Sequence, residues 1–239
     1  MDSLQRHSSI LTSERKKRSK IGIPGVATIE EVRNYKLLST YSGLHSAASP
    51  GILCLDIAEN DFGKFIATGG NDGNIVVFDK EKELVINTLK GHLKKINTVI
   101  FHPTEEMILS SSYDNTIRLW NLTEENGSSV LDIHQNSTSD ISLHPCGKYL
   151  LSGTRDGNWG FTDIHNNQLI LRVEEEELYR GINCAKFHPD GLIFGLGNSN
   201  SSIRIWDLRG PINVATFDHH NGLINSMSFS ENGENSLPY

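Results

Sequence analysis

Short apolar runs recur along the chain, and small residues end each of them. Runs of this kind lie at 66–70, 107–111 and 149–153, and each is followed by an Asp-containing turn and a second β-rich run. Asp72-Gly73 and Asp156-Gly157 are typical of hairpin turns, because glycine accepts a positive φ angle there. The pattern therefore predicts antiparallel strands throughout this part of the chain.

These runs belong to an internal repeat. Three segments end alike, at 74–79, 116–121 and 202–207, and a weaker version ends at 158–163. The final Asp or Asn residues are spaced 42, 42 and 44 residues apart. A period of about 40–45 residues with a Trp-Asp ending is typical of WD40 repeats, each of which supplies about four strands to a β-propeller. We therefore predict an all-β fold, an incomplete WD40 β-propeller of about four blades plus the start of a fifth.

The repeats divide the chain into four parts. We expect a basic leader without regular structure at 1–28, a short amphipathic helix at 29–40, WD40 repeats at 41–233 and a divergent tail at 234–239. The repeats themselves are placed at 41–80, 81–122, 123–164 and 165–208, with a partial repeat at 209–233. Ile29, Val32 and Leu37 can share one face of the helix, which we expect to pack on the flank of the propeller or on a partner.

One repeat carries the full set of polar residues usual in WD40 blades. The set consists of His92, Ser110, Asp114 and Trp120. By resemblance to WD40 proteins, the histidine bonds the aspartate of the turn, and the serine and tryptophan continue the network. Phe78 and Phe161 replace the tryptophan elsewhere, and Asn200 replaces the aspartate. We expect those blades to be held more by apolar packing.

Charge adds one feature to this picture. The net charge is −7, yet residues 1–20 contain six Lys or Arg and only two Asp or Glu. The basic residues Arg15, Lys16, Lys17, Arg18 and Lys20 form a candidate nuclear localisation signal or a patch for an RNA backbone; the alternative is an ordinary basic linker. The acidic remainder does not favour sequence-specific or broad nucleic-acid binding.

The acidic run at 174–177 also has two interpretations. It is either a solvated loop between blades or an acidic docking edge for a basic partner.

Nothing in the sequence indicates catalysis, a cofactor or a metal. His102, His144 and His188 occupy equivalent repeat positions, so they are expected to spread around the ring rather than converge on one ion. Cys54, Cys146 and Cys184 are far apart, which disfavours disulfides and zinc modules. No apolar stretch is long enough to span a membrane. We therefore predict no catalytic, cofactor-binding or metal-binding residue, and a cytosolic or nuclear location.

Several segments are more specific than a generic WD40 repeat. They lie at 11–20, 41–53, 89–103 and 186–208, and they include Gly-Leu-His-Ser-Ala and His-Pro-Asp-Gly-Leu-Ile-Phe-Gly. Through them the chain resembles the pre-mRNA-processing factor nineteen family of U-box ubiquitin ligases, from about Leu11 to Gly233.

The resemblance implies a nuclear scaffold that binds spliceosomal factors and ubiquitination substrates, with roles in pre-mRNA splicing and DNA repair. Family members have a seven-bladed propeller, a U-box that transfers ubiquitin and a coiled coil that forms homotetramers. The U-box and the coiled coil are not found in this sequence, so no ubiquitin-transfer activity is expected from this chain alone. Its expected end within the fifth repeat would leave the outer face of the fourth blade uncovered.

Two other functions are compatible with WD40 repeats. A generic WD40 adaptor without a ubiquitin or splicing role would share the repeats but not the specific segments. A propeller hydrolase would need convergent catalytic groups, and the sequence singles out none.

Overall fold

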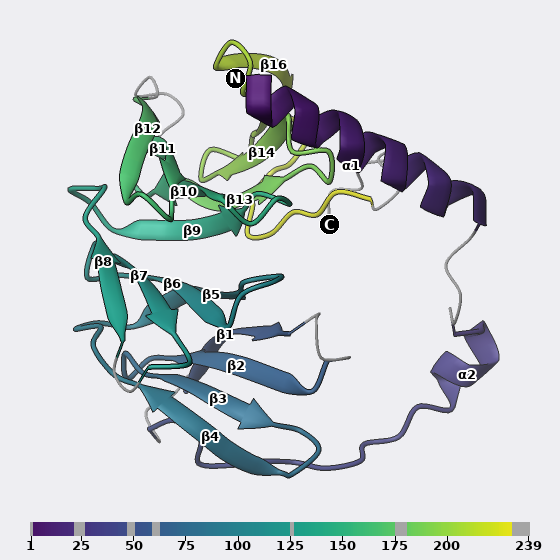
Figure 1. Cartoon of the computed structure of the whole chain (residues 1–239), viewed down its shortest axis with the longest axis vertical. Coiled ribbons are helices and arrows are strands. Elements are labelled where there is room, and N and C mark those ends of the chain that lie inside the picture. Colours follow the sequence, from purple (N-terminus) through teal and green to yellow (C-terminus); the bar gives the residue numbers. More distant parts are fainter. Residues whose placement is uncertain are drawn as a thin grey trace.

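The computed structural model describes residues 2–21, 27–46, 51–58, 63–124, 127–174 and 181–230, with the side chains of residues 2, 3 and 18–21 left out. The described strands form four separate sheets of four antiparallel strands each, in simple up-and-down order (Figure 1). We call these sheets blades 1 to 4 in chain order.

The strand bounds follow the repeat. Blade 1 consists of β1 (Ile52–Ile57), β2 (Phe65–Gly70), β3 (Ile75–Asp79) and β4 (Leu84–Leu89). Blade 2 consists of β5 (Ile96–Phe101), β6 (Met107–Ser112), β7 (Ile117–Asn121) and β8 (Ser128–Leu131). Blade 3 consists of β9 (Thr138–Leu143), β10 (Tyr149–Thr154), β11 (Trp159–Asp163) and β12 (Gln168–Val173). Blade 4 consists of β13 (Ile182–Phe187), β14 (Ile193–Asn198), β15 (Ile203–Asp207) and β16 (Ile212–Phe217).

The hairpin between the second and third strand of each blade needs one residue with a positive φ angle. Gly73 and Gly157 adopt φ angles of 77° and 94° at this position in blades 1 and 3. Asn115 and Ser201 hold the same position in blades 2 and 4 with φ angles of 74° and 71°. Both Asp-Gly pairs therefore lie in tight turns, as the sequence predicted, and the other two blades impose the same turn on a non-glycine residue.

The sequence repeats and the blades are out of phase by one strand. β4 lies within the interval 81–122, yet it pairs with β3 of blade 1, from Ile75 opposite Leu89 to Asp79 opposite Leu84. β8, β12 and β16 likewise complete blades 2, 3 and 4 from the interval that follows each. The intervals 41–80, 81–122, 123–164, 165–208 and 209–233 are therefore not blades. The intervals 81–122, 123–164 and 165–208 each span two blades and join them covalently.

The hydrophobic core lies between neighbouring blades. Between blades 1 and 2, the buried residues include Ile75 and Val77 on one side and Ile96 and Trp120 on the other. A second cluster joins blades 2 and 3, and a third joins blades 3 and 4 around the fully buried Trp159. Each sheet is therefore stabilised by the face of the next one.

The described blades do not close a ring. Apolar side chains of β1, such as Leu55 and Ile57, are exposed on the face where a further blade would pack. At the other end, Ile224 and Met227 are buried against Cys184 and other residues of blade 4. The expectation that this face of blade 4 is uncovered is thus only partly right, because the start of the fifth repeat covers its inner half. The tail 231–239 lies outside the described residues.

The leader does not match its prediction. Residues Asp2–Ile21 form the helix α1, which lies along blade 4 (Figure 1). Leu4 is buried in the cluster of blades 3 and 4, and Arg15 pairs with Asp190, so tertiary contacts hold a segment whose composition alone predicted no regular structure.

The predicted helix at 29–40 is shorter than expected. The helix α2 covers Ile29–Arg33 and begins with a capping box between Thr28 and Glu31. None of its residues is buried, and Leu37 lies beyond its end. Packing on the flank of the propeller is therefore not seen. Among the described residues, no helix is long and apolar enough to cross a membrane.

Candidate functional site

The polar network of blade 2 joins a loop to the inner strands. His92 Nδ1 lies 2.8 Å from Asp114 Oδ2, and His92 Nε2 lies 2.8 Å from Ser110 Oγ. Trp120 Nε1 donates to the same serine oxygen at 2.8 Å. The structure thus brings the four residues named from the sequence into one continuous chain of hydrogen bonds, which fixes the loop between blades 1 and 2.

Burial and hydrogen bonding set the charges in this network. Although burial acts to raise it, hydrogen bonds from Thr116, the Leu93 N–H and His92 lower the pKa of Asp114 to about 2. Burial lowers the pKa of His92, so its ring is held neutral near pH 7. The pair is therefore a hydrogen bond between a carboxylate and a neutral imidazole.

The other blades keep parts of this network. In blade 1, His45 contacts Asp72 at 3.1 Å and Thr68 at 2.9 Å. In blade 3, His134 Nε2 lies 2.6 Å from Ser152 Oγ, a partner that sequence reasoning did not assign. Among the described residues, His134 Nδ1 has no hydrogen-bond partner.

Blade 4 is held by aromatic packing instead. Trp206 lies 5.3 Å from Trp159 between ring centroids, and Trp159 lies 4.8 Å from Phe194. Within the described part of the chain, neither indole N–H has an acceptor. This agrees with the expectation that blades lacking network members depend on apolar contacts.

Buried histidines make the fold sensitive to mild acid. Burial lowers the pKa of His134 and of His144 to about 4, whereas an unfolded histidine has a pKa near 6.5. The unfolded state therefore binds more protons between these values, and stability present above pH 6.5 is lost as the pH falls toward 4. We expect the melting temperature to decrease across this window, and His134→Asn to make the decrease shallower. Thermal melts at pH 7, 5.5 and 4.5 measure it; an equally steep decrease in the variant would contradict the assignment.

A buried carboxylate connects three blades. Asp140, in β9 of blade 3, accepts hydrogen bonds from Thr98 Oγ1 of blade 2 at 2.6 Å and from the Ala185 N–H of blade 4 at 2.9 Å. It also accepts from its own neighbour, the Ile141 N–H, at 2.9 Å. Burial raises the pKa of Asp140, and Lys186 and these donors act in the opposite direction. Sequence reasoning missed this residue; an Asp inside a strand of a predicted core was the available signal.

The recurring His-Pro pairs have a similar role. His102 Nε2 bonds the Gly147 carbonyl of blade 3 at 2.8 Å, and His144 Nε2 bonds the Gly191 carbonyl of blade 4 at 3.0 Å. Both glycines have positive φ angles, and a Cβ on either would lie within 3 Å of the histidine ring. The His-Pro-x-Gly spacing at 144–147 and 188–191 therefore encodes contact between blades. The histidines spread over successive blades, as the sequence predicted.

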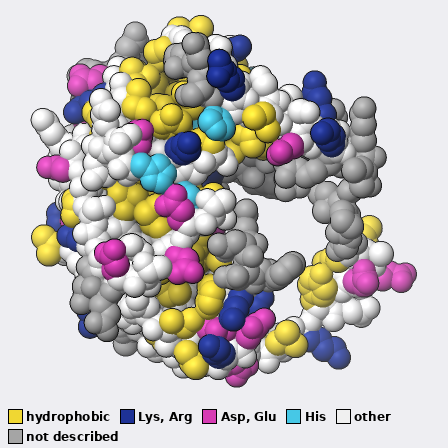
Figure 2. Space-filling model, in the orientation of Figure 1, with side chains coloured by type: hydrophobic (Ala, Val, Ile, Leu, Met, Phe, Trp, Pro, Cys, Tyr) yellow, Lys and Arg dark blue, Asp and Glu magenta, His cyan; other side chains and the backbone are white. Residues whose placement is uncertain are grey.

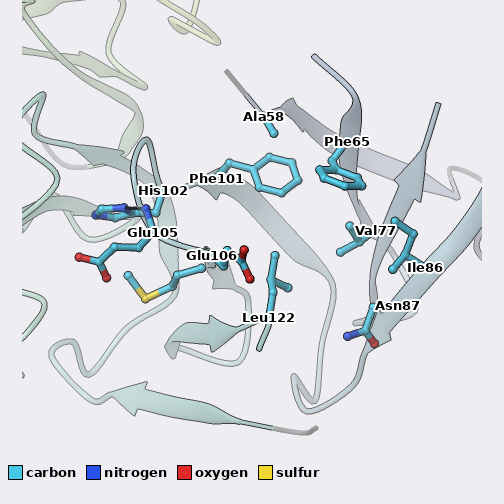
Figure 3. Close-up of a pocket in the computed structure, with 11 residues that line it drawn as sticks. Ala58, Phe65, Val77, Ile86, Asn87, Phe101, His102, Glu105, Glu106 and Leu122 are labelled. Atoms are coloured by element: carbon cyan, nitrogen blue, oxygen red, sulfur yellow. Dashed lines mark hydrogen bonds between the residues drawn. The ribbon is translucent and has the colours of Figure 1, made fainter. Parts of the chain in front are cut away.

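An apolar groove, which we call the 1/2 groove, opens between blades 1 and 2 (Figure 3). It has a volume of about 230 Å³. Its apolar lining is formed by Ala58, Phe65, Val77, Ile86, Phe101 and Leu122. Glu105 and Glu106 stand at its rim and are exposed to solvent. Such a groove, apolar inside and acidic outside, is suited to binding an apolar side chain beside a cation.

The basic segment lies on α1. Lys16 and Lys17 are exposed, whereas Arg15 donates from Nε and Nη2 to the two carboxylate oxygens of Asp190, each at 2.8 Å. The side chains of Arg18 and Lys20 lie outside the described set. Figure 2 shows that this face of the molecule is mixed, with basic side chains on α1, acidic ones at α2 and apolar ones exposed among the blades.

Two further expectations are only partly covered by the structure. Of the acidic run 174–177, Glu174 is exposed and residues 175–177 lie outside the described residues. Over the described ranges, no group of three or more His, Cys, Asp or Glu side chains is placed to hold a metal ion.

Burial raises the pKa of Cys54 and of Cys184 to about 12, so neither thiol is an activated nucleophile.

The repeated four-stranded sheets, the His–Ser–Trp network and the contacts between blades define a class of protein. The family model of the WD domain, G-beta repeat, matches residues 36–79, 84–121, 127–160 and 176–207, more than half of the chain. The chain therefore belongs to the WD40 repeat family.

Several of its relatives carry the name pre-mRNA-processing factor 19. The chain is 45% identical to the Bos taurus protein of that name over 226 residues, which cover 95% of this chain and 45% of that protein. The Homo sapiens protein matches with the same identity and coverage. The Oryza sativa subsp. japonica protein is 36% identical over 98% of this chain and 44% of its own length. The chain thus spans less than half the length of these relatives.

Proposed function

We propose that this chain is the partner- and substrate-binding WD40 scaffold of a pre-mRNA-processing factor that acts in splicing in the nucleus. The observation that carries the proposal is the 45% identity to pre-mRNA-processing factor 19 over 95% of the chain. This match is longer than the region 36–207 in which the WD40 family model matches, so it extends beyond the repeats themselves.

The proposed mechanism is recruitment of proteins. The polar network and the contacts through Asp140 hold the blades in fixed positions, so that loops and grooves between blades present a constant surface. Ubiquitin transfer and a role in DNA repair are proposed for the whole protein of this family, in which this chain captures spliceosomal factors and ubiquitination substrates. Homotetramer formation is likewise proposed for the whole protein.

The test is affinity purification from nuclei. We expect the tagged chain, expressed in mammalian cells and purified from nuclear extract after RNase treatment, to enrich spliceosomal proteins at least about tenfold over an unrelated WD40 propeller carrying the same tag. Quantitative mass spectrometry measures the enrichment. Equal recovery by both propellers would support the alternative, a generic WD40 adaptor, and would reject the proposal.

A further inference from the structure

The 1/2 groove has an equivalent two repeats further along the chain. A second groove, the 3/4 groove, opens between blades 3 and 4. The side chains that line it are Tyr149, Phe161, Ile170, Leu171, Leu208 and Pro211, together with Leu4 of α1. Apart from Leu4 and Pro211, these residues hold the same structural positions as lining residues of the 1/2 groove.

The strand registers establish this equivalence. Phe65 and Tyr149 are the first residues of β2 and β10, and each lies opposite the terminal Asp of the next strand. Ile86 and Ile170 are the extra residues of β-bulges, because the register shifts at this point in β4 and in β12. The two grooves are therefore the same feature of the repeat, built twice.

The second groove shows how a helix can contact such a site. Leu4 of α1 is only 7% exposed and packs in the cluster that includes Phe161 and Leu208. Further along the helix, Arg15 forms the bidentate pair with Asp190. The basic helix α1 thus contacts the 3/4 groove through Leu4 and, outside the lining of that groove, pairs with a carboxylate of blade 4 through Arg15.

The 1/2 groove offers a similar apolar lining, and among the described residues those that line it come from blades 1 and 2 and the segments that follow their strands, not from a helix. Phe65, Val77 and Ile86 face Phe101 and Leu122 across it (Figure 3). Ile86 is 49% exposed at the surface of β4. The carboxylates of Glu105 and Glu106 place negative charge at the 1/2 groove itself, whereas Asp190, which pairs with Arg15 of α1, lies in blade 4 beside the 3/4 groove lining.

We propose that the 1/2 groove binds a basic amphipathic helix of a partner protein, with an apolar contact like that of Leu4 in the 3/4 groove. An aliphatic side chain of the partner enters between Phe65, Val77 and Leu122, and an Arg or Lys on the same face of its helix pairs with Glu105 or Glu106. This is helix-in-groove recognition, with charge complementarity selecting a basic helix. The site is independent of which process the scaffold serves.

The test uses the whole chain and a labelled peptide with the sequence of residues 2–21, whose docking chemistry is known from α1. Binding is followed by fluorescence anisotropy. We expect saturable binding that Ile86→Glu weakens by roughly tenfold or more, because a carboxylate then occupies the apolar wall. Val214→Glu is the matched control, since Val214 is the bulge residue of β16 and is 51% exposed, and it should leave the affinity unchanged.

Further variants separate the two grooves. The double variant Glu105→Gln, Glu106→Gln should weaken binding by about fivefold and reduce its salt dependence, without altering the apolar lining. Loss of binding in Ile170→Glu but not in Ile86→Glu would mean that the peptide exchanges with α1, and would overturn the proposal. Absence of any peptide binding would also overturn it.

A measurement of the oligomeric state tests whether a second copy of the chain occupies the 1/2 groove. If sedimentation shows that the chain self-associates and that Ile86→Glu abolishes this, the 1/2 groove receives α1 of a second copy, and the proposed partner protein is wrong. A monomeric chain that binds the peptide through Ile86 supports the proposal.

Discussion

Asp140→Ala is expected to lower the free energy of unfolding by about 3 kcal/mol or more, enough to leave a marginal fold largely unfolded. The substitution removes the acceptor shared by Thr98 Oγ1, the Ile141 N–H and the Ala185 N–H. Two of these donors belong to neighbouring blades, and all three are then left without their carboxylate partner in a buried position. Urea denaturation followed by tryptophan fluorescence measures the change.

The matched control is Ser142→Ala, two residues along the same strand. Ser142 Oγ accepts one hydrogen bond across the same blade junction, from the Phe187 N–H at 3.1 Å. Its loss should cost about 1 kcal/mol. Asp140→Asn should fall between the two, because the amide keeps one acceptor oxygen. If Asp140→Ala costs no more than Ser142→Ala, the carboxylate does not hold the three blades together.

His92→Ala is the second substitution with a large expected effect, a loss of about 3 kcal/mol in the free energy of unfolding. The imidazole bonds Asp114 and Ser110 through its two nitrogens, and its removal leaves a cavity and takes one hydrogen-bond partner from each of these buried groups. The same urea denaturation measures the loss, and retained β circular dichroism at low urea shows that the variant still folds.

Blade 3 provides the comparison for this experiment. His134→Ala removes a similarly buried ring that, within the described part of the chain, has one hydrogen-bond partner, Ser152 Oγ. We expect its cost to be about half that of His92→Ala, because fewer polar groups lose a partner. Equal losses would show that the ring volume, and not the hydrogen-bond network, accounts for the stabilisation.

The internal repeat explains which features of the fold could be predicted from the sequence. The 42-residue period and the Asp-Gly turns predicted the strands, and the hydrogen bonds of His92, Ser110, Asp114 and Trp120 lie where the resemblance to WD40 blades put them. The pattern was local, because each strand and turn is determined mainly by residues within one repeat. The sequence pattern did not show which strands share a blade, since a repeating pattern can be divided at any strand.

The helix α1 shows the opposite case. Its polar, basic sequence predicted no regular structure, and only the 3/4 groove and Asp190 of blade 4 provide the contacts of Leu4 and Arg15 that stabilise it. An isolated helix of this kind has no apolar partner, so its formation depends on residues about 150 or more positions away.

The sequence by itself determined the all-β class, the repeat and the turns, because these follow from side-chain periodicity and from residue types at fixed spacing. The polar network of blade 2 was expected from the resemblance of this repeat to WD40 blades. Only the tertiary structure decided which strands share a blade, that Asp140 joins three blades, and that Phe65 and Tyr149 line equivalent grooves. Those features arise where blades meet, and the packing of one repeat against the next is a property of the assembled fold rather than of any single segment.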